Sequence, residues 1–229
     1  MIFTILLAGG SGTRVTGYPM PKQFITIRNK PLLEWALIPF LTHRRIDQIV
    51  IVSHHDYVEQ VRAITSKFTD KPIHIVGGGP TRQASVFQGL SLLKKHACDD
   101  DIVIIHDAAR VLVDHPIINR GLDMMIGDIG LSAVIPAADT LMETGENNTL
   151  TRVIDRNRVS IIQTPQIFHF KTIYDAHLSN VGGSFTDDVS LLIGRIAIHH
   201  FLGSGLNFKV TTAADIRLLE NLLTQEGAP

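Results

Sequence analysis

The chain has 229 residues, of which 45% are hydrophobic, and its formal net charge is −1. This length suits one α/β domain, and we expect residues 1–229 to form a single domain. The balanced charge argues against a nucleic-acid partner, because such proteins carry a basic excess. No apolar run reaches about 18 residues, so we expect no membrane partner and no membrane-spanning helix.

The amino terminus and the single cysteine, Cys98, indicate where the protein resides. The chain starts directly with a strand-like segment and lacks the basic start and apolar stretch of a signal peptide. One cysteine cannot form an intrachain disulfide or a cysteine metal cluster. We therefore expect a cytoplasmic protein.

Short apolar runs alternate with helix-patterned segments along most of the chain. The strand-like runs are residues 2–7, 48–53, 73–76, 102–106, 132–136 and 196–201. The segments between the first five runs carry apolar residues at helical spacing. Examples are Leu33, Leu37 and Phe40 in one segment, and Ile117, Leu122, Met125 and Ile126 in another. This alternation predicts a Rossmann-like α/β fold, with a mainly parallel sheet and helices on both of its faces.

Residues 137–157 interrupt this alternation. The turn-rich letters "ETGENNT" are flanked by residues 140–142 and 150–154, two runs of mixed polarity. This pattern predicts a β-hairpin that projects from the sheet as a β-arm. A lone two-stranded hairpin is marginally stable in water, so we expect the β-arm to pack on a second subunit and form a homodimer.

The first strand-like run leads into a loop within the letters "ILLAGGSGTRVTGYPMPKQF", residues 5–24. The loop contains several glycines, among them Gly9, Gly10 and Gly12, and two cations, Arg14 and Lys22. Glycines let backbone amides approach anionic oxygens, and open α/β sheets bind ligands beyond the carboxyl ends of their strands. The spacing matches neither a P-loop nor a dinucleotide fingerprint. We interpret the loop as a nucleoside triphosphate site; the alternative is a tight strand-to-loop turn.

A second glycine-rich loop, "GGGPTRQASV", spans residues 77–86 and also follows a strand-like run. Thr81 has the position of a helix N-cap, and Arg82 and Ser85 follow it within the first turn. Amide donors, a hydroxyl and a cation thus occur together, which favours a second part of the nucleotide site. The alternative is a glycine turn followed by a capped helix.

The third loop, "IIHDAAR", places Asp107 just beyond a strand-like run and Arg110 three residues later. A carboxylate there can coordinate a divalent cation or accept a hydrogen bond from a hydroxyl group. Arg110 lies within reach of a phosphate. The alternative is an aspartate that caps the following turn.

Four later motifs contain polar residues with structural alternatives. They are "IDRNR" with Arg156, "QTPQIF" with Thr164, "SFTDDVSL" with Thr186, and "LNFKVTT" with Lys209. Thr186 has the pattern of a helix N-cap, which is often purely structural. Lys209 occupies a strand-like run, where a lysine is usually a solvated surface residue.

The eleven histidines include two adjacent pairs, His54–His55 and His199–His200. Adjacent residues point to different sides of a strand or helix. We therefore expect no metal site built from histidine and carboxylate side chains.

Together these motifs resemble those of the cytidylyltransferases that activate small polyol phosphates. The resemblance is to the 2-C-methyl-D-erythritol 4-phosphate cytidylyltransferase family, including its ribitol-5-phosphate cytidylyltransferase-like members. It rests on eight segments in order: "LAGGSGTR…PKQF", "GGGPTRQASV", "HDAAR", "DT" at Asp139–Thr140, "DRN", "QTPQIF", "FTDDVSL" and "NFKVT". Because these segments span nearly the whole chain, the resemblance implies a fold of the nucleotidyltransferase type.

The resemblance also implies roles for individual residues. Catalytic roles would fall to Arg14, Lys22, Arg156 and Lys209. The nucleotide would contact Leu7, Ala8, Gly9, Gly10, Gly12, Thr13, Gly78, Arg82 and Ser85. The acceptor polyol phosphate would contact Asp107, Arg110, Thr140, Thr164 and Thr186. Mg²⁺, or another divalent cation, would be the cofactor, with Asp107 as its candidate ligand.

The implied reaction joins CTP and 2-C-methyl-D-erythritol 4-phosphate to give a CDP-polyol and pyrophosphate, a step toward isoprenoid precursors. Val111 and Leu206 depart from the methylerythritol pattern, which usually has a proline and often an acid there, whereas "DRN" favours that pattern. The alternative acceptor is ribitol 5-phosphate or another polyol phosphate used for cell-surface polysaccharide. Two further alternatives are an inactive nucleotide-binding module and a sugar-1-phosphate nucleotidyltransferase that uses another base.

Overall fold

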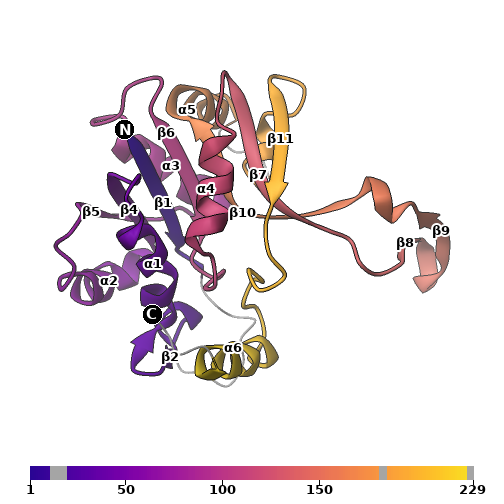
Figure 1. Cartoon of the computed structure of the whole chain (residues 1–229), viewed down its shortest axis with the longest axis horizontal. Helices are drawn as coiled ribbons and strands as arrows, with labels where there is room; N and C mark the ends of the chain where they lie inside the picture. The colour runs from indigo at the N-terminus through magenta and orange to yellow at the C-terminus, as the bar shows by residue number, and fades with distance from the viewer. Residues whose placement is uncertain (11–19, 181–184, 226–229) are drawn as a thin grey trace.

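The structure is a computed structural model that describes residues 1–10, 20–180 and 185–225. Within these residues, one central sheet has seven strands in the order β11-β7-β10-β6-β1-β4-β5 (Figure 1). The strands are β1 (Ile2–Ala8), β4 (Gln48–Ser53), β5 (Ile73–Gly77), β6 (Ile102–Asp107), β7 (Ile129–Pro136), β10 (Ser160–His169) and β11 (Ala197–Leu202). β10 runs antiparallel to β6 and β7, and the other neighbouring pairs are parallel. The mainly parallel sheet expected from the sequence is confirmed.

The central strands are apolar because helices cover both of their faces. In β1, Phe3, Ile5 and Leu6 are fully buried. Strand alternation places Leu6 in the hydrophobic cluster on one face, whereas Phe3 and Ile5 join the cluster on the other. A nearly continuous apolar run is therefore the sequence signature of this position in the sheet.

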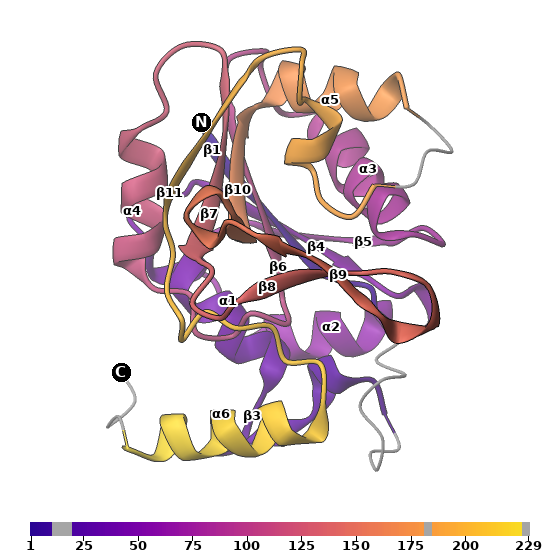
Figure 2. The same ribbon diagram turned by 90° about the vertical axis from the view of Figure 1, so that its right-hand side faces the viewer.

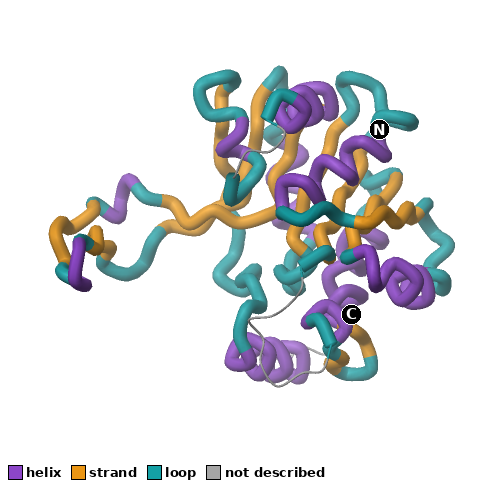
Figure 3. Tube along the Cα trace, turned by 180° about the vertical axis from the view of Figure 1, so that it is seen from behind, coloured by secondary structure: helices purple, strands orange, loops and turns teal. Residues whose placement is uncertain are grey.

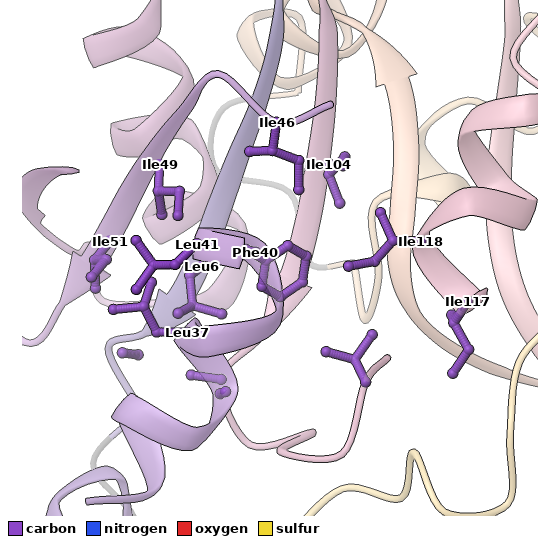
Figure 4. Close-up of a cluster of buried hydrophobic side chains, with 14 of the residues drawn as sticks. Leu6, Leu37, Phe40, Leu41, Ile46, Ile49, Ile51, Ile104, Ile117 and Ile118 are labelled. Atoms are coloured by element: carbon purple, nitrogen blue, oxygen red, sulfur yellow. The ribbon is translucent and has the colours of Figure 1, made fainter. Parts of the chain in front are cut away.

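Five helices cover the two faces of the sheet in the part of the chain that the structure describes. α1 (Leu32–Thr42), α2 (Val58–Thr65) and α4 (His115–Asp123) lie on one face, and α3 (Arg82–Leu93) and α5 (Phe170–Leu178) on the other (Figure 2). Figure 4 shows the first core, where Leu37 and Phe40 of α1 lie against Leu6 of β1. Each fully buried side chain of this kind stabilises the fold by about 1.5–3 kcal/mol.

A sixth helix, α6 (Ala213–Gln225), packs beside α1 and the small hairpin of β2 (Thr26–Ile27) and β3 (Lys30–Pro31). Thr212 and Asp215 cap it reciprocally, since Asp215 Oδ2 accepts from Thr212 N and Thr212 Oγ1 accepts from Asp215 N. The segment that leads into α6 carries Lys209 and buried Val210, whose backbone N donates to Ala109 O. Lys209 thus lies in a loop, and its expected strand placement is wrong.

The hairpin formed by β8 (Leu141–Thr144) and β9 (Leu150–Ile154) projects far from the body of the protein (Figures 1 and 3). Met142 pairs with Val153 across its two antiparallel strands. Leu150 is 64% exposed and Val153 63% exposed. The hairpin thus presents apolar side chains that this chain does not cover.

β10 and α4 also differ from the sequence-based expectation. β10 was not expected, because the letters "QTPQ" read as a polar break in an apolar run. Gln163 and Gln166 are nevertheless buried and hydrogen-bonded, for example from Gln166 Nε2 to Ser132 Oγ. The helix expected to include Met125 and Ile126 ends earlier, at Asp123, and Ile126 is exposed.

None of the helices described by the structure combines the length and the apolar character that a membrane crossing requires.

Candidate active site

A cavity of about 680 Å³ opens at the carboxyl ends of β1, β4, β5 and β6. The strand order reverses at β1, since the chain passes from β1 to β4 and β5 on one side and later adds β6 on the other. Open α/β sheets bind ligands at such a switch point. The cavity is lined by residues of five loops, among them Gly9, His54, Gly78, Ala108 and Lys209, and by Asp107 at the end of β6.

The loop after β1 returns to the cavity at the short helix η1 (Lys22–Phe24). Lys22 Nζ donates to Val210 O at 2.7 Å, and Gln23 Nε2 donates to Ala8 O at 2.9 Å. These bonds hold the lysine beside the end of β1 and beside the segment that carries Lys209. Among the residues expected to contact the nucleotide, Leu7, Ala8, Gly9 and Gly10 line the cavity, whereas Gly12, Thr13 and Arg14 lie outside the described residues.

The loop after β5 folds back tightly onto the sheet. Gly78 N donates to Ser53 O at 2.6 Å, and Ser85 Oγ accepts from Gly79 N at 3.2 Å. A Cβ atom at Gly78 would lie 2.8 Å from Ser85 Oγ and 3.2 Å from Ser53 O, so a side chain there requires movement. Thr81 caps α3 through Ala84 N at 3.0 Å, as its sequence position predicts. The loop therefore presents glycine backbone and a serine hydroxyl to the cavity.

Asp107, at the end of β6, links the cations of the site. Its Oδ2 accepts from Lys209 Nζ at 2.6 Å, and its Oδ1 accepts from Arg82 Nε at 3.3 Å. Arg82 also donates through Nη1 to Asp188 Oδ2 at 2.7 Å, and Asp188 Oδ1 lies 3.0 Å from His177 Nε2. Asp188 and His177 are both buried. Arg82 thus bridges two carboxylates, one at the cavity and one beneath it.

Charge pairing keeps these groups ionised. Burial alone would raise the pKa of Asp107, but Arg82 and Lys209 outweigh it and hold this pKa well below its ordinary value. Burial likewise opposes ionisation of Asp188, yet Arg82 and His177 lower its pKa. Burial would lower the pKa of Arg82, but Asp188 and Asp107 raise it. The cavity therefore contains a fixed carboxylate between two fixed cations.

Behind Asp107, a chain of hydrogen bonds determines the tautomer of His106. Its Nε2 lies 2.9 Å from Arg110 O, and because a carbonyl only accepts, Nε2 carries the proton. Nδ1 must then accept, from Thr164 Oγ1 at 3.0 Å, and Thr164 Oγ1 accepts from Asp107 N at 3.1 Å. Burial lowers the pKa of His106 from 6.5 to about 4, so the ring is neutral at pH 7. His106 and Thr164 thus fix the backbone on both sides of Asp107.

Acidification is expected to weaken the fold through His106. The unfolded state binds a proton near pH 6.5 that the folded state takes up only near pH 4, so stability falls as pH falls across this window. The shift corresponds to about 3 kcal/mol. Urea unfolding of His106→Asn between pH 7 and pH 4 should give a shallower slope of stability against pH than wild type. His200→Asn, at an exposed position in β11, is the control and should keep the wild-type slope. A wild-type slope in His106→Asn would contradict the assignment of this pH dependence to His106.

Several expected site residues lie apart from the cavity lining. Thr164 is buried and engaged with His106, and Arg110 donates to Asn207 O and Ile162 O. Thr140 and Arg156 lie at the base of the hairpin, where Arg156 Nη1 donates to Ala138 O at 2.6 Å. Within one chain these two do not reach the cavity lining that the structure describes.

Thr186 is exposed, and its expected role as a helix N-cap is wrong. The following helix is the single turn η5 (Val189–Leu191), with Asp188 at its N-cap position. Asp187 Oδ1 accepts from Ser190 N at 2.9 Å and stabilises this turn instead.

Sequence reasoning missed three residues that organise the site. Asp188 pairs with Arg82, His106 orients the Asp107 backbone, and Gln23 binds the end of β1. Each is adjacent to a residue singled out in the sequence or belongs to the same motif. The polar letters "DD", "HD" and "KQ" were therefore the available signal, but only the structure shows which partner each of these side chains binds.

Comparison with known proteins identifies the family. The model of the family described as 2-C-methyl-D-erythritol 4-phosphate cytidylyltransferase matches residues 2–225. A ribitol-5-phosphate cytidylyltransferase from Lactiplantibacillus plantarum is 34% identical, over 99% of this chain and 100% of that protein. A 2-C-methyl-D-erythritol 4-phosphate cytidylyltransferase from Clostridium botulinum is 37% identical, over 96% of each chain.

A solved structure shows the same fold. The 4-diphosphocytidyl-2C-methyl-D-erythritol synthase of Anaerococcus prevotii superposes with a TM-score of 0.82 at 25% identity, covering 97% of this chain and 98% of that one. These matches confirm the resemblance drawn from the motifs and the expected class of enzyme, a nucleotidyltransferase. The chain belongs to the 2-C-methyl-D-erythritol 4-phosphate cytidylyltransferase family.

Proposed function

We propose that this enzyme transfers a cytidylyl group from CTP to 2-C-methyl-D-erythritol 4-phosphate and releases pyrophosphate. The observation that carries the proposal is the convergence of Lys22, Lys209 and Asp107 with the Gly78–Ser85 loop in one cavity. The two lysines suit the triphosphate, and the glycine backbone with the Ser85 hydroxyl suits the base and ribose. The loop containing Gly12, Thr13 and Arg14 is assigned to the phosphates on its sequence alone.

The reaction is an in-line displacement at the α-phosphorus. A phosphate oxygen of the acceptor forms the new bond to phosphorus, the bond to the β-phosphate oxygen breaks, and pyrophosphate leaves with its electron pair. Because the nucleophile is already an anion at pH 7, no general base is required. The enzyme must instead bring two polyanions together, so positioning and electrostatic stabilisation dominate catalysis. Lys22, Lys209 and Arg82 supply the positive charge among the described residues of the cavity lining.

The donor chemistry of Asp107 fits Mg²⁺. Its carboxylate is ionised and lines the cavity, and Mg²⁺ is usually held by one or two carboxylates together with substrate phosphates. Both oxygens are engaged with Arg82 and Lys209, so binding the ion requires Asp107 to exchange one of these partners. When bound, Mg²⁺ would neutralise charge on the triphosphate.

Measuring the rate of pyrophosphate release with different polyol phosphates identifies the acceptor. Purified enzyme with CTP and Mg²⁺ should release pyrophosphate fastest with methylerythritol phosphate in a panel that includes ribitol 5-phosphate and neighbouring polyol phosphates. The full-length similarity to a ribitol-5-phosphate cytidylyltransferase makes ribitol 5-phosphate the second candidate. Faster turnover with ribitol 5-phosphate than with methylerythritol phosphate would show that ribitol 5-phosphate is the acceptor. CTP binding without turnover on any acceptor would favour an inactive nucleotide-binding module.

We also propose that the hairpin, the β-arm of residues 137–157, crosses to a partner subunit and completes its site. The exposed apolar side chains of the arm indicate that another surface covers them in the assembly. Thr140 and Arg156 are not part of the described lining of their own cavity, which supports a role for them in the partner's cavity. The assembly would be a homodimer of single-domain subunits. The free, exposed thiol of Cys98 suits the reducing cytoplasm.

Mixing two inactive variants tests this composite site. Lys22→Met disables the cavity of its own subunit, whereas Arg156→Ala disables the arm that serves the partner. In a mixed dimer one of the two sites has both parts intact. After unfolding and refolding together, the variants should recover about a quarter of wild-type activity, because half the dimers are mixed and each has one complete site. No recovery, with mixed dimers demonstrated by mass spectrometry, contradicts the crossing arm.

A further inference from the structure

His54, His55 and Asp56 form a cluster directly after β4, at the rim of the cavity. Each offers one ligand atom, and these atoms all lie within 4.8 Å of one another. No other group of three histidine, cysteine or acidic side chains has this property among the residues the structure describes. Both histidines line the cavity.

The two imidazole rings stack, with their centroids 4.3 Å apart, although adjacent residues were expected to diverge. β4 ends at Ser53, and the short helix η2 (His55–Tyr57) begins two residues later. This change of backbone direction brings neighbouring side chains together. The other adjacent pair, His199 and His200, lies inside β11, where strand alternation places the side chains on opposite sides.

The atoms around the Asp56 carboxylate already have the separations of a metal site. His54 Nδ1 lies 3.5 Å from Asp56 Oδ2, and His55 Nε2 lies 3.1 Å from Asp56 Oδ1. Ligand atoms that share a tetrahedral Zn²⁺ at about 2.0–2.2 Å lie about 3.3 Å apart. The two stacked rings must rotate out of their stack so that a nitrogen lone pair of each meets one ion beside the carboxylate.

The protonation of His54 also suits a ligand. Its Nδ1 accepts a long hydrogen bond of 3.3 Å from Asp56 N, so in the neutral ring the proton is on Nε2 and the lone pair on Nδ1. An unprotonated ring nitrogen is the form that binds metals. A metal ion can take the place of this long bond.

We propose that His54, His55 and Asp56 bind one Zn²⁺-type ion at the rim of the cavity. Two imidazoles and one carboxylate favour Zn²⁺, Co²⁺ or Ni²⁺ over Mg²⁺, which prefers oxygen ligands. The site is therefore chemically distinct from the carboxylate of Asp107. Three protein ligands leave one position of a tetrahedral ion for water or for a molecule in the cavity.

Metal titration of the untagged full chain tests the site without reference to catalysis. Co²⁺ binding followed by visible absorption, and Zn²⁺ binding followed by calorimetry, should each show one specific ion per chain. His54→Ala/His55→Ala should weaken binding by at least about 100-fold, since even removing a group that only orients a ligand costs about 10–100-fold. Asp56→Asn should also weaken it.

The other histidine pair is the matched control, because His199→Ala/His200→Ala also removes two adjacent imidazoles. This variant should keep wild-type affinity. Thermal unfolding without metal checks that each variant is folded. If the double variant is unstable, the metal affinity of the single variant His55→Gln, at a largely exposed position, is measured instead. Equal affinity in both double variants, or no specific ion in the wild type, would overturn the proposal.

Discussion

Lys22→Met is expected to lower kcat/KM for pyrophosphate release by about 10²–10³-fold, the usual cost of removing one preorganised donor to a developing charge. Lys22 lines the cavity, and its Nζ is held by Val210 O beside the end of β1. Two unit charges about 4 Å apart interact by about 4 kcal/mol at an effective dielectric of 20, so this magnitude is within reach of one ammonium group. Steady-state kinetics with CTP and the preferred acceptor measure it.

The control for this variant is Lys95→Met. Lys95 is exposed just beyond α3 and lies outside the cavity lining. It should keep wild-type kinetics, which separates a local charge effect from a change in net charge. Wild-type turnover in a folded Lys22→Met variant would remove Lys22 from the proposed triphosphate site.

Arg82→Met is expected to destabilise the fold by about 3–5 kcal/mol, because removal of one partner leaves a buried charge uncompensated. Asp188 is 1% exposed and would keep only His177 as a partner among the contacts described here, while Asp107 would keep Lys209. For a chain of this size the loss corresponds to a fall in Tm of roughly 10 °C. Thermal and urea unfolding at pH 7 measure it.

The pH dependence of this loss identifies its cause. Asp188 and Asp107 have lowered pKa values in the folded state, so their ion pairs stabilise the protein above the ordinary aspartate pKa. That contribution disappears as pH falls toward the lowered values. The stability difference between wild type and Arg82→Met should therefore narrow below about pH 4.

The exposed pair Arg45–Asp123 supplies the comparison. Arg45→Met breaks an ion pair whose aspartate is 67% exposed, so it should cost less than about 1 kcal/mol. If Arg82→Met lowers the free energy of unfolding by no more than Arg45→Met does, Arg82 does not hold the site together.

The sequence predicted the fold class because burial on both faces of a parallel sheet leaves a local signature. β1 and β6 read as apolar runs, and the loops after parallel strands must meet at one edge. The meeting of Gly9, Gly78 and Asp107 in one cavity follows from this rule. β10 escaped prediction because its polar residues are buried and paired, which no local pattern reveals.

The ion pairs of the site could not be predicted, because they join residues that are distant in sequence. Asp188 is 106 positions from Arg82, and Lys209 is 102 positions from Asp107. The sequence motifs singled out Arg82 and Lys209 as cations of the site, but the local pattern could not predict which carboxylates they pair with. It also misplaced the His54 and His55 side chains, because the exact end of β4 decides whether neighbouring residues diverge or stack.

The most direct measurement is a crystal structure of the enzyme with Mg²⁺ and a non-hydrolysable CTP analogue. We expect the triphosphate within hydrogen-bond distance of Lys22 Nζ and Lys209 Nζ, and the cytosine beside Gly78 and Ser85. A nucleotide bound outside this cavity, or one whose phosphates lie away from both lysines, would contradict the proposed site.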